Sequence, residues 1–162
     1  MPEHWDWTDV DARLAAELAE RLPERVMDAH AHVYRREDVH FPTDHLFMVG
    51  PERVDADAWR ERVGRLIGPE RLAGGLFFGV PEPKTDTDTI NGFVVEQITA
   101  CDDARALMVL DPRQSPDAVA AFLDAQPCAI GFKPYHRYSP RETTYDAPLP
   151  EFLPEWAWEL AD

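Results

Sequence analysis

Short apolar runs alternate with helical segments four times along this chain, and this alternation limits the possible folds more than any other feature. The apolar runs cover residues 25–33, 72–80, 104–111 and 128–135, and each is long enough for one buried strand. Helical spacing of apolar residues covers 55–67 and 87–101, and Ser115-Pro116 opens another helix, which Pro127 closes. Strands that alternate with helices in this way predict βαβ units and a parallel sheet.

A helix before the first strand and a long connection after it complete the predicted organisation. Thr8 can cap a helix over residues 8–22, which Pro23 ends, and residues 34–53 are expected to form a polar and aromatic loop. We therefore expect one domain, 1–162, in which residues 1–24 lead in and residues 25–162 form four βα units, the last with a short final helix.

Four βα units are half of a (β/α)8 barrel of the TIM type. The chain has 162 residues, whereas a complete barrel typically needs about 250. The expected fold class is therefore α/β with only the first four βα units of such a barrel, as a fragment or as a half-barrel. The outermost strands of either would be open edges. The expected covering partner is the missing C-terminal half of the barrel or a homo-oligomer.

Composition excludes several classes of partner. The net charge is −15, from 31 acidic and 16 basic residues, which argues against nucleic-acid binding. This acidic, lysine-poor composition is typical of proteins from salt-loving microbes, whose surface repulsion is screened by salt. Neither a signal peptide nor an apolar run of membrane-spanning length is evident, so a cytoplasmic protein without a membrane partner is expected. Cys101 and Cys128 are expected to be reduced and largely buried.

The strongest chemical motif is the pair His30 and His32 at the end of the first predicted strand. Alternate side chains of a strand share a face, so both imidazoles should point the same way and could converge on one divalent metal ion. Asp28 would share that face and orient them, and Ala29 and Ala31 would face the helices. The plainer alternative is two histidines that only pack and hydrogen-bond near a strand end.

The segment VMDAHAHVY, residues 26–34, resembles the first-strand metal motif of the amidohydrolase superfamily, in particular its amidohydrolase-related branch. AIGFKPY, residues 129–135, resembles the fourth-strand motif of that branch. The resemblance covers essentially the whole chain as the first four βα units. It implies a distorted barrel with one or two divalent metal ions, commonly zinc. It also places further metal ligands and the catalytic base on later strands, beyond residue 162.

Lys133 lies on the fourth predicted strand and is one of only two lysines in the chain. Gly131, Lys133 and Tyr135 should alternate on one face, with Ile130 and Phe132 on the other. By resemblance, a lysine here is carboxylated and bridges two metals, or stays free and binds an anionic substrate. The alternative from the residues alone is a lysine that extends to the solvent at the rim.

The remaining candidates lie where loops should border the site. Arg113 could bind a substrate carboxylate through two hydrogen bonds, or simply pair with a neighbouring acid in a turn. The candidate substrate-binding residues are Arg113, Tyr135, His136 and His40. His45, in the same loop as His40, is a weaker candidate, since surface histidines are common in loops.

Three functions fit this reading. The first is a metal-dependent hydrolase in which metal-activated water attacks an amide, ester or lactone-like centre of a small-molecule substrate. The second is a metal-dependent decarboxylase or other lyase on the same barrel, with Arg113 or Lys133 holding a carboxylate. The third is a non-catalytic half-barrel that serves as a binding subunit.

Overall fold

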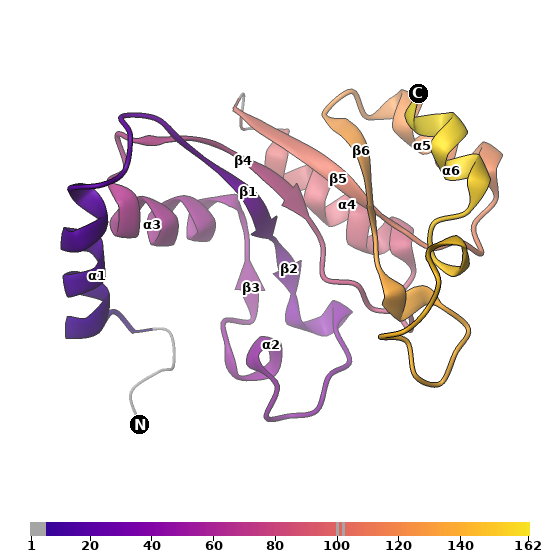
Figure 1. Cartoon of the computed structure of the whole chain (residues 1–162), viewed down its shortest axis with the longest axis horizontal. Helices are drawn as coiled ribbons and strands as arrows, with labels where there is room; N and C mark the ends of the chain where they lie inside the picture. Colours follow the sequence, from indigo (N-terminus) through magenta and orange to yellow (C-terminus); the bar gives the residue numbers. More distant parts are fainter. Residues whose placement is uncertain (1–5, 100, 102) are drawn as a thin grey trace.

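The computed structural model describes residues 6–99, 101 and 103–162, and it shows an α/β protein built on a parallel sheet. Four strands lie in the order β1-β4-β5-β6, and each neighbouring pair is parallel (Figure 1). Their bounds are Val26–His32 for β1, Leu72–Phe78 for β4, Ala104–Leu110 for β5 and Ala129–Pro134 for β6. The four predicted strands and their parallel pairing are confirmed.

The predicted helices are also present, and side-chain caps begin two of them. They are α1 (Asp9–Ala19), α3 (Ala56–Ile67), α4 (Thr87–Ile98), α5 (Pro116–Ala125) and α6 (Glu155–Ala161). Thr8 caps α1 in a reciprocal bond pair with Asp11, and the Asp55 carboxylate accepts from the Ala58 amide at the start of α3. Ser115 precedes α5 without a side-chain capping bond. Residues 1–5 of the predicted lead-in and residue 100 of the predicted helix 87–101 lie outside the described residues.

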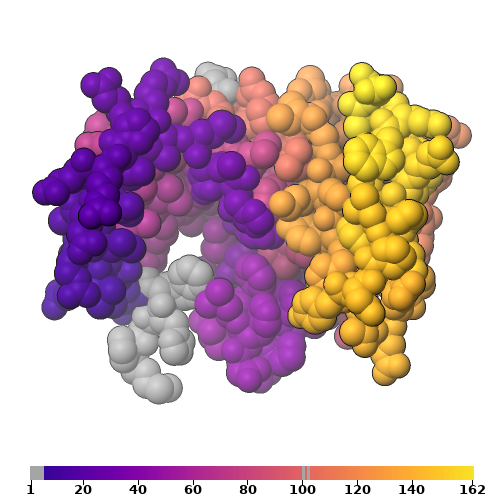
Figure 2. Space-filling model, in the orientation of Figure 1, coloured from indigo at the N-terminus to yellow at the C-terminus, as the bar shows by residue number. Residues whose placement is uncertain are grey.

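The core lies between the sheet and the helices α3 and α4. Trp59 of α3 and Phe93 of α4 are buried with Phe77 of β4, which is 0% exposed. Figure 1 shows α1 beside α3, on which it packs, and α5 beside α6 at the other end of the sheet. In Figure 2 the indigo surface of α1 and the yellow surface of α6 form opposite borders of the face shown.

The connection 34–53 was wrongly predicted to be a plain loop. It contains β2 (Tyr34–Arg35), a 3-10 turn (Arg36–Asp38) and α2 (Leu46–Val49), and it leads into β3 (Arg53–Val54), which pairs antiparallel with β2. Tyr34 and Val39 are buried in a small cluster with Val80. This cluster anchors the connection at the carboxyl end of the sheet (Figure 1).

Strands β1, β4 and β6 each carry an extra residue, and this changes which side chains share a face. On β4 it lies between Leu72 and Gly74, opposite Val26 and Met27 of β1. Between Asp28 and Ala31, β1 advances three residues while β4 advances two, from Gly75 to Phe77. Such an irregularity reverses the alternation of side chains. Ala31 is buried in the core as predicted, but the predictions for Asp28 and Ala29 were wrong: Asp28 bonds to Trp59 of α3, and Ala29 is exposed.

On β6 the extra residue is Ile130. The strand advances from Ala129 to Gly131 while β5 advances one residue, from Ala106 to Leu107. Ile130 is 59% exposed, whereas Phe132 packs against the core. The two were predicted to share a face, and the irregularity separates them.

Two smaller expectations concern the cysteines. Cys101 and Cys128 are free thiols, as expected, but they are half-buried rather than buried. In the described part of the chain, no helix is both long and apolar enough to cross a membrane.

Candidate metal centre

His30 and His32 lie together at the carboxyl end of β1, as the sequence predicts. Their ring centroids are 5.2 Å apart and their planes are inclined by 61°. Two imidazoles bound to one tetrahedral ion at about 2.0–2.1 Å have centroids roughly 5 Å apart, so the observed spacing fits a shared metal ion. His30 is exposed and His32 is half-buried, which leaves the pair open to solvent on one side.

The backbone of the loop after β4 holds the His32 ring in place. Its Nδ1 lies 3.1 Å from the Gly79 carbonyl oxygen. A carbonyl can only accept, so Nδ1 carries the proton and Nε2 keeps its lone pair for a ligand. A carbonyl that fixes the tautomer in this way is a common companion of a metal-binding histidine.

Burial keeps the His32 ring neutral. Desolvation, followed by the charges of His30 and Lys133, lowers the pKa of His32 from 6.5 to about 4, although the bond to Gly79 opposes the shift. A neutral imidazole is the form that binds a metal, so His32 is in its ligating form at neutral pH.

This low pKa predicts that acid destabilises the fold through His32. The unfolded chain takes up a proton near pH 6.5 and the folded chain only near pH 4, so the stabilisation is complete above pH 6.5 and is lost as the pH falls towards 4. The shift corresponds to a loss on the order of 3 kcal/mol. Urea denaturation at several pH values should show a shallower loss for H32N than for the native chain. Parallel curves for the two would contradict this assignment.

The Phe78 ring packs against both histidine rings. It is 0% exposed, and its ring centroid lies 4.8 Å from that of His30 and 4.7 Å from that of His32, edge to face in both cases. Nothing in the spacing of residues singles out Phe78 within an apolar strand. Its position on the histidine face follows from its alternation with Phe77, which faces the helices.

Lys133, on β6, lies over the same Phe78 ring. Its Nζ lies 4.7 Å from the Phe78 ring centroid and 5.8 Å from that of Tyr135. Its charge also contributes to the lowered pKa of His32. The structure thus brings Lys133 to the histidine pair, although β4 and β5 lie between their strands.

Asp28 does not orient an imidazole, which corrects the sequence prediction. Its carboxylate accepts from the Trp59 indole at 2.8 Å and from the backbone amide of His30 at 3.0 Å. The reversed alternation on β1 turns this side chain towards α3. Asp28 therefore positions the backbone of His30 rather than its ring.

The loop histidines have local partners. His40 is exposed, and its Nδ1 is 3.4 Å from the Thr85 hydroxyl. His45 begins α2, where its ring accepts from the Phe47 amide and stacks on Phe41 with centroids 4.0 Å apart. His136 Nδ1 lies 2.8 Å from the Thr144 hydroxyl.

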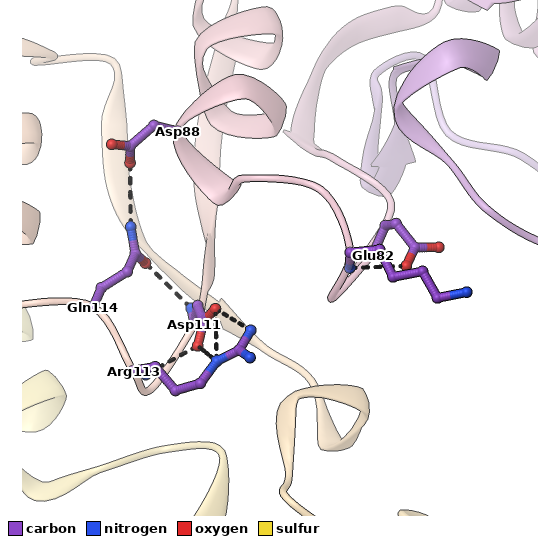
Figure 3. A network of polar contacts seen from close by, with 6 residues as sticks. Glu82, Asp88, Asp111, Arg113 and Gln114 are labelled. Carbon is purple, nitrogen blue, oxygen red and sulfur yellow. Dashed lines mark hydrogen bonds and ion pairs between the residues drawn. The ribbon is translucent and has the colours of Figure 1, made fainter.

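Arg113 and Tyr135 also lie near the carboxyl ends of the strands. Arg113 follows β5, and its guanidinium binds both carboxylate oxygens of Asp111, the closest contact being 2.6 Å (Figure 3). Arg113 thus adopts the alternative stated for it, in which it pairs with a neighbouring acid in a turn. Tyr135 is half-buried, and its hydroxyl has no hydrogen-bond partner among the residues described.

Glu82 was missed by the sequence reasoning. It is 1% exposed in the loop after β4, and its carboxylate accepts from the amides of His40 at 3.0 Å and Lys84 at 3.1 Å. Figure 3 shows it in the loop after β4. It ties the connection after β1 to the loop after β4. A glutamate among prolines gives no periodicity that would reveal its burial.

Over residues 6–99, 101 and 103–162, no three His, Cys, Asp or Glu side chains are grouped closely enough to hold a metal ion. The described chain therefore contributes two imidazoles, with Lys133 nearby. No family model, curated protein or solved structure matches this chain.

Proposed function

We propose that this chain provides the first two metal ligands of a metal-dependent hydrolase of the amidohydrolase type. The observation that carries the proposal is the His30–His32 pair, with centroids 5.2 Å apart and Nε2 of His32 left free by the bond from Nδ1 to Gly79. Together with the resemblance of VMDAHAHVY and AIGFKPY to the superfamily motifs, this geometry favours a divalent ion, commonly zinc, over a packing role.

The position of the pair supports a barrel-type arrangement. The histidines lie at the carboxyl end of a parallel strand, where (β/α)8 barrels hold their active sites. Phe78 and Lys133 share their face of the sheet, opposite the helices. We accordingly propose that the four strands are the first half of a TIM-type barrel, and that its C-terminal half, or a second copy of the chain, covers the edges of β1 and β6.

The chemistry follows from the groups at this face. A divalent ion supplies Lewis acidity and lowers the pKa of a coordinated water towards neutrality. His32 would hold the ion through Nε2, while the Gly79 carbonyl keeps its ring in place. Lys133 is close enough to bind an anionic part of the substrate, or, once carboxylated, to serve as a further ligand.

The alternative functions differ in the reaction product that they predict. A metal-dependent decarboxylase would use the same imidazoles and hold a substrate carboxylate on Lys133 or Arg113. Since Arg113 already binds Asp111, a lyase would have to hold the substrate carboxylate on Lys133. A binding subunit would show no turnover.

A direct test is to assay the zinc-loaded barrel, completed by its C-terminal half, with aryl esters and lactones, and in parallel for carbon dioxide release from aromatic acids. With the further ligands and the catalytic base supplied by that half, we expect ester or lactone hydrolysis that a chelator abolishes and added zinc restores. Carbon dioxide release without hydrolysis would favour the lyase. A completed, folded and zinc-binding barrel without either activity would favour the binding subunit.

A further inference from the structure

A cavity lies at the carboxyl end of the sheet, and neither histidine of the proposed metal centre lines it. Its volume is about 320 Å³, within the range of small-molecule sites. Its walls come from the loops after β4, β5 and β6 and from the 3-10 turn Leu149–Glu151. The lining residues are Pro83, Pro112, Arg113, Arg137, Tyr138, Ser139, Pro140 and Glu151.

Arg137 has unused hydrogen-bond donors at this cavity. Its guanidinium lies over the Phe41 ring, 4.6 Å from the centroid, and one Nη is 3.8 Å from the Glu82 carboxylate. Within the described residues it donates no hydrogen bond, and its Nε is buried without a partner. A guanidinium offers five N–H donors, and burying one unpaired is costly, so the side chain is suited to an anionic acceptor that the chain itself does not provide.

Tyr138 provides a second unpaired group. The residue is 4% exposed and lines the cavity, yet its hydroxyl has no hydrogen-bond partner in the part of the chain that is described. The Glu82 backbone amide also faces this hydroxyl, without the geometry of a hydrogen bond. An amide can only donate, so the phenolic proton remains available for an acceptor in the cavity.

The carboxylates around the cavity already have partners. Glu82 accepts from two backbone amides, and Asp111 is held by Arg113. Glu151, at the cavity wall, binds Arg141 at 2.8 Å and the Ser139 hydroxyl at 2.5 Å. Arg137 therefore differs from Arg113 and Arg141, since each of those is neutralised by close hydrogen bonds.

The remaining walls are apolar and rigid. Three of the lining residues are prolines, which have no N–H and a fixed φ. A bare inorganic ion would gain nothing from such walls, whereas a carbon skeleton would bury apolar surface against them. From this combination we propose that the cavity binds a small organic acid, with its carboxylate on the Arg137 guanidinium and the Tyr138 hydroxyl and its apolar body against the prolines.

The test is calorimetric titration of the full chain with benzoate, acetate and inorganic phosphate. We expect benzoate to bind more tightly than acetate or phosphate. R137Q should weaken benzoate binding about tenfold or more, because a charge-assisted bidentate contact is lost. R137K keeps the charge but not the planar guanidinium, so its affinity for benzoate should lie between those of R137Q and the native chain. Y138F should weaken binding about threefold to tenfold through one lost hydrogen bond.

The matched control is R65Q. Arg65 is exposed on α3 and, like Arg137, lies over an aromatic ring, 4.3 Å from the Trp7 centroid. The R65Q substitution should leave the affinity for benzoate unchanged. Should R137Q not fold, R137K and Y138F carry the same test. Absence of benzoate binding, equal affinity in R137K, Y138F and the native chain, or equal affinity for phosphate would each overturn the proposal. None of these outcomes depends on zinc, so failure here is distinguishable from failure of the metal site.

Discussion

The double variant H30N/H32N will lose zinc binding, with an affinity at least about a hundredfold below that of the native chain. The expectation follows from the two rings being the only imidazoles that the structure brings together among the described residues. Each single variant should lose a large part of the affinity, since one imidazole alone forms a weak site. Isothermal titration calorimetry with zinc gives the affinities. Nitrogen NMR of the imidazoles should show metal on Nε2 of His32 and a proton on its Nδ1.

The control for this prediction is H136N. His136 also belongs to the carboxyl end of the sheet, but its ring is bound to Thr144 and lies 5.0 Å from Tyr145. Its removal should leave zinc affinity unchanged. If H30N/H32N binds zinc as tightly as the native chain, the ion is held elsewhere and the proposed metal centre is wrong.

The repeated strands and helices could be predicted because periodicity and caps act locally. The apolar runs of β4 and β5, the helical spacing over 55–67 and the capping position Thr8 identify their elements without any knowledge of the tertiary fold. The β2–β3 pair escaped prediction because two-residue strands have no period, and their burial depends on Val80, far along the chain.

The shared face of the histidine pair was predicted correctly because two residues on one strand, two positions apart, need only local geometry. Asp28 was misplaced because the extra residue on β1 lies between it and the histidines, and such an irregularity depends on pairing with β4. Glu82 and Arg137 come together from two loops, at 3.8 Å, through the order of the strands. The spacing of residues in the sequence does not predict such a contact between distant loops.

Replacing Phe78 with alanine will both destabilise the protein and weaken the metal site. The ring is 0% exposed, so its removal should lower the free energy of unfolding by about 3–5 kcal/mol. It also supports His30, His32 and Lys133, all within 4.8 Å of its centroid. Without it, water reaches His32, and because desolvation is the largest cause of the low pKa, that pKa should rise from about 4 towards 6.5.

Phe77 provides a matched comparison for this prediction. It precedes Phe78 on β4, is equally buried at 0% exposure, and packs on Trp59 at 4.7 Å on the helix side of the sheet. F77A should therefore lose similar stability in urea denaturation while zinc affinity and the pKa of His32 stay close to native. If F77A and F78A lower zinc affinity equally, the loss comes from general loosening of the sheet. A loss confined to F78A means that one aromatic ring, chosen by strand alternation, holds the two imidazoles in their binding arrangement.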